Sequence, residues 1–129
     1  ERYSLTKKVN FIQHCKEMPL AYSLADVVVS ASVEPEAFGR VAVESQSMGK
    51  PIIASNIGGS KETVLNKKTG FLYKHDDPRE LAKSLNTVIQ LNQEELKLMG
   101  NEGRKNVAKK FDVELMCDSN LREYKKLLK

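Results

Sequence analysis

Two short runs of β-branched residues, joined by one helical pattern, constrain the fold of this chain most. The runs are Val27–Val29 and Ile52-Ile53, and neither alternates with polar residues, which is typical of strands buried on both faces of a parallel sheet. Between them, apolar residues recur at helical spacing from Phe38 to Met48, and Gly49 stands where a helix often ends in a left-handed residue. Because two such strands joined by a helix form a right-handed parallel crossover, we expect an α/β sheet covered by helices.

The same patterns predict the remaining elements, and the second half of the chain is mainly helical. We expect short elements at Val9–Ile12 (strand), Pro19–Ala25 (helix), Lys61–Val64 (a turn of helix) and Gly70–Tyr73 (a strand at an edge). We expect longer helices from Pro78 to about Leu91 with Asp77 as N-cap, from Gln93 to Lys110 with interruptions at Gly100 and Gly103, and from Asp112 to Leu128. Residues 93–129 should therefore form a helical C-terminal tail.

The size and composition of the chain fit one soluble domain, residues 1–129, in a reducing cytoplasmic setting. Charged residues make up 29% and hydrophobic residues 40%, which argues against a disordered or membrane-spanning chain. The two cysteines, Cys15 and Cys117, lie far apart and form no CxxC motif, so they indicate neither a disulfide framework nor a zinc site. Residue 1 is Glu1 and the first residues read like the end of a helix, so we expect a truncated domain.

The distribution of charge along the chain argues against a nucleic-acid partner. The net charge is +4, but the basic pairs, such as Lys109-Lys110, are separated by acids and carry few aromatic neighbours. We therefore predict no nucleic-acid partner.

The adjacent acids Asp76 and Asp77 do not indicate a metal site. Their side chains point in different directions, and Asp77 before Pro78 is a good helix N-cap, so no metal site is predicted.

Two carboxylates, Glu36 and Glu44, flank the start of the helix between the two buried strands. Eight residues of helix span roughly 12 Å, and the amides near Gly39 lie between the two carboxylates as unpaired donors of a helix N-terminus, where diphosphates bind. Carboxylates accept strong hydrogen bonds from vicinal hydroxyls, so the layout suits a sugar diphosphate. The alternative is that Glu44 merely pairs with Arg40 on a solvated helix face.

Paired glycines, Gly58-Gly59, follow the second buried strand. Ligands of open α/β sheets gather at the carboxyl ends of such strands, and the two glycines predict a tight turn with exposed amides. The turn is not GxGxxG, so the nicotinamide fingerprint is absent. Its position makes it a second part of the candidate site.

Together these residues resemble the donor-binding half of the retaining glycosyltransferases of family 4, which have the GT-B fold of two facing Rossmann-like domains. The resemblance covers residues 9–92, and the remaining helices look like the C-terminal tail of that family. It implies a Rossmann-like parallel sheet forming part of a GT-B C-terminal domain. The matching positions are Ser30, Ser32, Glu36, Phe38, Gly39, Glu44, Gly49, Pro51–Ser55, Gly58, Gly59, Glu62, Gly70–Leu72, Asp77 and Pro78.

The resemblance also implies roles for single residues. Glu36, the catalytic candidate, would contact hydroxyls of the transferred sugar, and Glu44 would contact the ribose of the nucleotide. The remaining donor-binding candidates would hold sugar or phosphate oxygens or line the pocket wall. They are Phe38, Gly39, Arg40, Val41, Gly58 and Gly59. The family needs no divalent metal, so no metal and no cofactor is expected beside the nucleotide-sugar substrate.

The sequence departs from the family in ways that carry expectations. Gln46 and Ser47 make the helix from Phe38 to Met48 unusually polar and predict that it is more exposed. The family has a basic pair that neutralises the diphosphate, and it has an N-terminal domain that binds the acceptor. We expect both to lie outside this chain, and we therefore expect no transferase activity from the chain alone.

The last helix carries two further expectations. Its apolar residues, such as Met116, would be left uncovered, and a homodimer could hide them. Its basic end, including Lys125, could touch lipid at the inner face of the membrane, or it could be simply solvated.

We therefore predict the nucleotide-sugar-binding part of a retaining glycosyltransferase of the hexosyltransferase type. Its acceptor would be a polysaccharide, a lipopolysaccharide or a glycolipid. A non-catalytic remnant or interaction module with the same fold is the first alternative, and a fragment of a GT-B-fold sugar-nucleotide epimerase is the second. Binding of a nucleotide sugar would separate the first alternative from the prediction.

Overall fold

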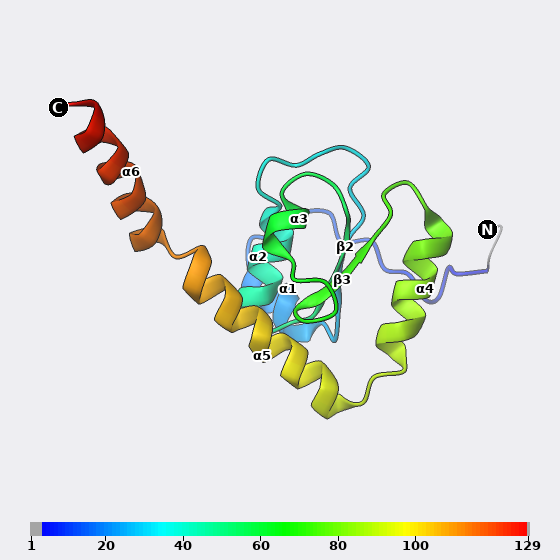
Figure 1. Cartoon of the computed structure of the whole chain (residues 1–129). Helices are drawn as coiled ribbons and strands as arrows, with labels where there is room; N and C mark the ends of the chain where they lie inside the picture. The colour runs from blue at the N-terminus through cyan, green and yellow to red at the C-terminus, as the bar shows by residue number, and fades with distance from the viewer. Residues whose placement is uncertain (1–3, 129) are drawn as a thin grey trace.

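The computed structural model describes residues 4–128, and it alternates strands and helices in its first half before ending in three helices (Figure 1). The elements are α1 (Met18–Leu24), β1 (Val28–Ser30), α2 (Arg40–Ser47), β2 (Ile52–Ser55), α3 (Ser60–Thr63), β3 (Gly70–Tyr73), α4 (Pro78–Ile89), α5 (Gln93–Lys110) and α6 (Val113–Leu127).

The three strands form one parallel sheet in the order β1-β2-β3. Val28 is opposite Ile52, and Ile52 is opposite Gly70, so the chain returns to the same end of the sheet before each strand. Parallel strands require such crossovers, and α2 supplies the first of them. The predicted strand–helix–strand unit and the edge position of β3 are confirmed.

Both faces of the sheet are covered, which explains why its strands are apolar without alternation. Ile52 and Ala54 of β2 pack with Ala42 of α2 on one face. Ile53 points to the other face and packs with Tyr73 and Val88, the latter from α4. Successive side chains of a strand alternate between faces, so β2 contributes to both layers of the core. The predicted α/β sheet covered by helices is confirmed.

The long helix α5 crosses α2 and begins with a capping box. The Asn92 side chain accepts from the Glu95 amide, and the Glu95 side chain accepts from the Asn92 amide. A Cβ atom on Gly100 would lie 2.0 Å from the carbonyl oxygen of Gly49, so only glycine permits this close crossing. The predicted interruptions of the helix at Gly100 and Gly103 are wrong, because the glycines serve the crossing and α5 runs through both.

The predicted strand at Val9–Ile12 is wrong. The segment forms no regular element, and Phe11 and Ile12 are 94% and 81% exposed. A strand needs a neighbour for its N–H and C=O groups, and within residues 4–128 this segment pairs with none of the three strands. Its apolar, β-prone composition therefore has no sheet to join.

The prediction of an exposed, polar α2 is also wrong. Ser45 and Gln46 are completely buried. The Gln46 side-chain amide donates to the carbonyl oxygens of Ala42, at 2.9 Å, and of Thr63 on α3, at 3.0 Å. These polar groups are buried because they have hydrogen-bond partners on their own and neighbouring helices.

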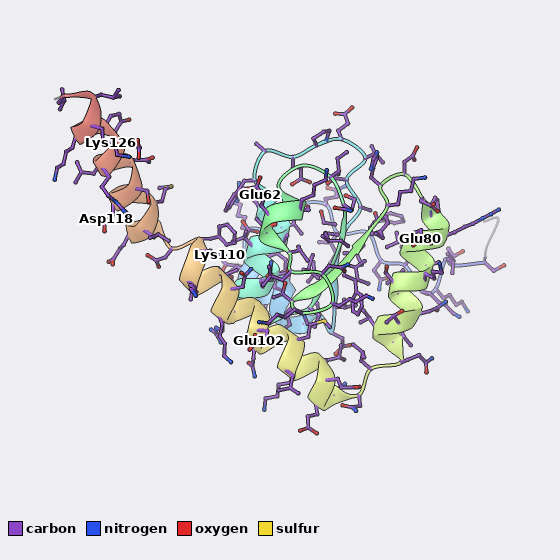
Figure 2. All side chains as sticks on the ribbon, in the orientation of Figure 1. Glu62, Glu80, Glu102, Lys110, Asp118 and Lys126 are labelled. Atoms are coloured by element: carbon purple, nitrogen blue, oxygen red, sulfur yellow. The ribbon has the colours of Figure 1, made fainter. Side chains whose placement is uncertain are left out.

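The last helix, α6, extends beyond the body of the molecule, and no residue of it is buried (Figures 1 and 2). Val113, Met116 and Leu121 are 64%, 56% and 51% exposed, as the sequence suggested. Asp112 caps the helix by accepting from the Glu114 amide, so its local structure is well specified even without packing. Among residues 4–128, no helix has the length and apolar character needed to cross a membrane.

Candidate functional site

The candidate site lies at the carboxyl ends of β1 and β2. The two strands are parallel neighbours, with Ser30 opposite Ala54, so the segments that follow them leave from the same edge of the sheet. Residues 31–39 lead from β1 to α2, and residues 56–59 lead from β2 to α3 (Figure 1). This edge is where ligands bind in open parallel α/β sheets.

The two predicted segments are in direct contact. The Gly59 amide donates to the carbonyl oxygen of Glu36 at 2.7 Å. A Cβ atom on Gly58 would lie 2.4 Å from that same oxygen, and a Cβ atom on Gly59 would lie 2.5 Å from the Phe38 backbone. The glycine pair therefore lets one loop lie directly on the other, and the structure brings together residues that are more than 20 positions apart in the sequence.

The N-terminus of α2 lies beside this contact and has no side-chain cap. Gly39 occupies the N-cap position in the left-handed conformation, with a φ of 76°. Within residues 4–128, the other helices of at least eight residues begin with a capping side chain, namely Asp77, Asn92 and Asp112. The first amides of α2, including those of Arg40 and Val41, have no acceptor within their own helix, so they can receive an anionic oxygen.

The Glu44 carboxylate is held from two sides. Its Oε2 accepts from the Tyr22 hydroxyl of α1 at 2.8 Å, and its Oε1 accepts from Arg40 at 3.1 Å. The pair with Arg40 is the alternative considered from the sequence, and it is present. Since the Arg40 side chain is 83% exposed, that pair contributes only a few tenths of a kcal/mol, and vicinal hydroxyls of a ligand could replace it.

Glu36 has a different environment. The hydroxyl of Ser32 donates to its carboxylate, and both residues are half-buried in the loop after β1. The backbone of Glu36 is fixed by Gly59, as described above. Ser32 thus orients the Glu36 carboxylate, and Gly59 fixes the main chain that carries it.

Phe38 connects the site to the C-terminal helices. Its ring packs edge-on against Phe111, with ring centroids 5.6 Å apart and planes inclined by 75°. Phe111 lies between α5 and α6, so the loop before α2 contacts the junction of these two helices. Phe38 remains 45% exposed. It also borders an apolar groove of about 490 Å³ that includes Val113, Leu115 and Met116 of α6.

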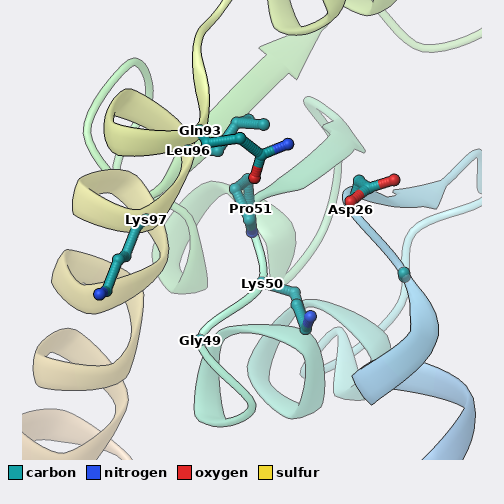
Figure 3. A pocket seen from close by; sticks show the side chains of 8 residues that line it. Asp26, Gly49, Lys50, Pro51, Gln93, Leu96 and Lys97 are labelled. Atoms are coloured by element: carbon teal, nitrogen blue, oxygen red, sulfur yellow. The ribbon is translucent and has the colours of Figure 1, made fainter.

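A separate cavity of about 300 Å³ lies at the amino ends of the strands, opposite to the candidate site (Figure 3). It is bordered by Asp26, Lys50 and Pro51, which precede β1 and β2, and by Gln93 and Leu96 of α5. The Lys50 ammonium group donates to the carbonyl oxygen of Ser23 at 2.9 Å. Because this cavity lies at the amino ends of the strands, it is not part of the candidate site.

A model of the family described as "Glycosyl transferases group 1" matches residues 1–106, which is most of the chain. The chain belongs to this family. The predicted resemblance to GT-B glycosyltransferases is therefore confirmed, and so is the Rossmann-like fold. Among solved structures, a glycosyltransferase from Rickettsia africae ESF-5 is 35% identical over 99% of this chain and 34% of that one, with a TM-score of 0.92.

Two further relatives of this group 1 chain have more specific descriptions. The structure of Anabaena Alr3699/HepE in complex with UDP and glucose is 29% identical, covers 97% of this chain and 34% of that one, and has a TM-score of 0.89. The "capsular polysaccharide biosynthesis glycosyltransferase CapM" of Staphylococcus aureus is 31% identical over 97% of this chain and 33% of its own length. The chain thus spans about one third of the length of each of these three relatives.

Two residues of the candidate site were not found from the sequence. Tyr22 is the one buried residue of α1, yet the sequence shows only an aromatic residue on a short helix far from Glu44. Phe111 stands at a helix boundary that was predicted, but its contact with Phe38 depends on how α5 crosses α2. Among residues 4–128, no group of three or more His, Cys, Asp or Glu side chains could hold a metal ion.

The ionisation of Tyr22 gives a testable consequence. Burial, followed by the hydrogen bond to the Glu44 carboxylate, raises the pKa of Tyr22 to about 12. The unfolded chain loses this proton near pH 10, so the contribution to stability is fully present below about pH 10 and is lost as the pH rises towards about 12. We expect the difference in the free energy of unfolding between wild type and Tyr22→Phe to shrink above about pH 10. Urea unfolding at several pH values measures it, and a difference independent of pH would contradict the assignment.

Proposed function

We propose that this chain is the nucleotide-sugar-binding part of a retaining glycosyltransferase of the hexosyltransferase type. Family membership supports a glycosyltransferase, and the complex of HepE with UDP and glucose supports a nucleotide-sugar donor. The name of CapM supports a polysaccharide as acceptor, and a lipopolysaccharide or glycolipid remains within the proposal. In this proposal the acceptor is bound by residues outside the chain, and the chain alone has no transferase activity.

The observation that carries the proposal is the contact of the Glu36 loop with the Gly58-Gly59 turn, beside the uncapped start of α2, the helix that carries Glu44. In the proposed complex, Glu36 accepts hydrogen bonds from the transferred sugar. Glu44 accepts from the ribose hydroxyls, with Tyr22 keeping the carboxylate in place.

The diphosphate would lie between the two carboxylates, at the amides of Gly39, Arg40 and Val41. Preorganised donors aimed at the leaving diphosphate stabilise the charge that develops as the sugar is transferred, so no divalent metal is needed in this proposal. When the ribose replaces Arg40 at Glu44, the guanidinium becomes free to approach the phosphates. Phe38 and the Gly58-Gly59 turn would form the walls of the donor pocket.

Replacing Glu44 with alanine tests the proposal. We expect Glu44→Ala to weaken binding of UDP by roughly 1.5–3 kcal/mol, because charge-assisted bonds to the ribose are lost. The affinity is measured by titrating the chain with UDP and UDP-glucose while following amide shifts by NMR. Shifts in the wild type should concentrate at Gly39–Glu44 and Gly58-Gly59.

Glu123→Ala is the matched control. It also removes an exposed ion pair within a helix, that of Glu123 with Lys126 at 2.7 Å, but on α6, far from the site (Figure 2). It should leave the affinity for UDP unchanged. Equal affinities of Glu44→Ala and wild type would remove Glu44 from the site, and a wild type that binds no nucleotide at millimolar concentration would favour a non-catalytic remnant with the same fold.

A further inference from the structure

Three buried polar side chains connect the helices behind the candidate site. They are Gln46 of α2, Thr63 of α3 and Asn106 of α5, with exposed fractions of 0%, 1% and 6%. We call the two amide side chains, those of Gln46 and Asn106, the amide cluster. Burying polar side chains is costly unless they are hydrogen-bonded, so their partners indicate what the cluster does.

The amide cluster converges on one atom, the carbonyl oxygen of Thr63 at the end of α3. This oxygen accepts from the Gln46 side chain at 3.0 Å and from the Asn106 side chain at 3.1 Å. Asn106 also donates to the side-chain oxygen of Gln46 at 3.3 Å. The last carbonyls of a helix have no partner within it, so two side chains from two other helices fix the end of α3.

The start of α3 is the Gly58-Gly59 turn. The Thr63 hydroxyl donates to the Gly59 carbonyl oxygen at 3.0 Å, which ties the end of this four-residue helix to its beginning. The Gly59 amide holds the Glu36 carbonyl oxygen, and neither glycine has room for even one more carbon atom. A rotation or shift of α3 must therefore move the Glu36 loop as well.

We propose that Gln46 and Asn106 are positioning residues, which fix α3 so that its first turn holds Glu36 in the geometry for nucleotide-sugar binding. Neither side chain is placed to touch the ligand, and both act through Thr63 and Gly59. This inference rests on the proposed function, because it names what the fixed loop is used for.

Stability alone gives a poor account of the amide cluster. The side-chain oxygen of Asn106 accepts no hydrogen bond from any group of residues 4–128, although it is buried. Replacing buried polar partners together by apolar groups of similar shape is often neutral or stabilising. A stable crossing of α2 and α5 could thus be made without these amides, whereas a fixed carbonyl at the end of α3 could not.

The test is the double variant Gln46→Met/Asn106→Leu in the full 129-residue chain. We expect it to fold, with a melting temperature lowered by roughly 5–10 °C, because the buried carbonyl oxygen of Thr63 loses both of its side-chain donors. Because the hydrogen bonds that fix α3 are gone, we expect affinity for UDP to fall roughly tenfold and hydrogen exchange of the Gly59 amide to accelerate by a similar factor. The exchange measurement needs no ligand.

Ser45→Ala is the matched control. It removes an equally buried hydrogen bond of α2, from Ser45 to the Ala42 carbonyl oxygen, that never reaches α3. It should change neither the affinity for UDP nor exchange at Gly59. If the double variant does not fold, Asn106→Leu alone decides, since it keeps the bond from Gln46 to Thr63, and we expect about threefold effects on both readouts.

The outcomes separate this inference from the proposed function. A double variant that keeps wild-type affinity and wild-type exchange at Gly59 would overturn the positioning role, and so would a Ser45→Ala variant with effects as large. If the wild type binds no UDP, the proposed function fails for this chain, and exchange at Gly59 alone decides whether the amide cluster fixes the turn.

Discussion

Gly58→Ala is expected to lower the free energy of unfolding by roughly 2–5 kcal/mol and to displace the Glu36 loop. Two costs add at this position. The φ of Gly58 is +55°, a conformation that costs an alanine about 1–2 kcal/mol. The new Cβ atom would also lie 2.4 Å from the Glu36 carbonyl oxygen, and overpacking of this kind costs about 1–3 kcal/mol. Urea unfolding followed by circular dichroism measures the loss.

Gly49→Ala is the control that separates the two costs. Gly49 has a similar φ of +69°, but its Cβ atom would find its nearest neighbour, the Gly100 carbonyl oxygen, at 4.0 Å. It should therefore show only the conformational cost, about 1–2 kcal/mol. Equal losses of unfolding free energy for the two variants would mean that the loop moves to accommodate the new Cβ atom. The close contact between Gly58 and Glu36 would then contribute nothing to stability.

Ile53→Ala is expected to lower the free energy of unfolding by about 2–5 kcal/mol. Ile53 is completely buried in the central strand and packs with Tyr73 and Val88 on the α4 side of the sheet. Its truncation removes apolar contacts and leaves a cavity that the paired strands on both sides cannot easily close. The measurement is again urea unfolding, with the midpoint and the slope compared to wild type.

Ile89→Ala provides the same chemical change without burial. Ile89 ends α4 and is 70% exposed, so its truncation should change the free energy of unfolding by no more than about 0.5 kcal/mol. A loss at Ile53 as small as that at Ile89 would show that the α4 side of the sheet contributes little to stability.

The sequence predicted those features that depend on neighbours along the chain. The bounds of α5, the N-cap at Asp77 and the strands on either side of α2 follow from local patterns of apolar spacing and turn residues. The parallel topology followed from them, because a strand, a helix and a second buried strand leave few other arrangements.

Features that depend on contacts between distant segments were missed. Gln46 looked like a solvated residue because its partners, Thr63 and Asn106, are 17 and 60 positions away. Val9–Ile12 has the composition of a strand, but composition does not reveal whether a partner strand exists. Local propensity therefore predicts poorly which residues are buried and which segments form strands when these depend on tertiary contacts.

The candidate site shows the same division. The spacing of Glu36 and Glu44 and the glycine pair could be read from the sequence, and the structure places the Glu36 loop on the glycine turn. The residues that orient these groups, such as Tyr22, come from other elements and carry no local pattern. Their recognition required the fold.

The projecting position of α6 determines how the unfolding of this chain must be analysed. A helix that buries none of its residues gains no cooperativity from the sheet and melts gradually, as an isolated helix does. The helical signal will therefore combine a broad loss from α6 with a sharp transition of the body. Two-state analysis applies to the body, and side-chain probes near β2 report that transition without the contribution of α6.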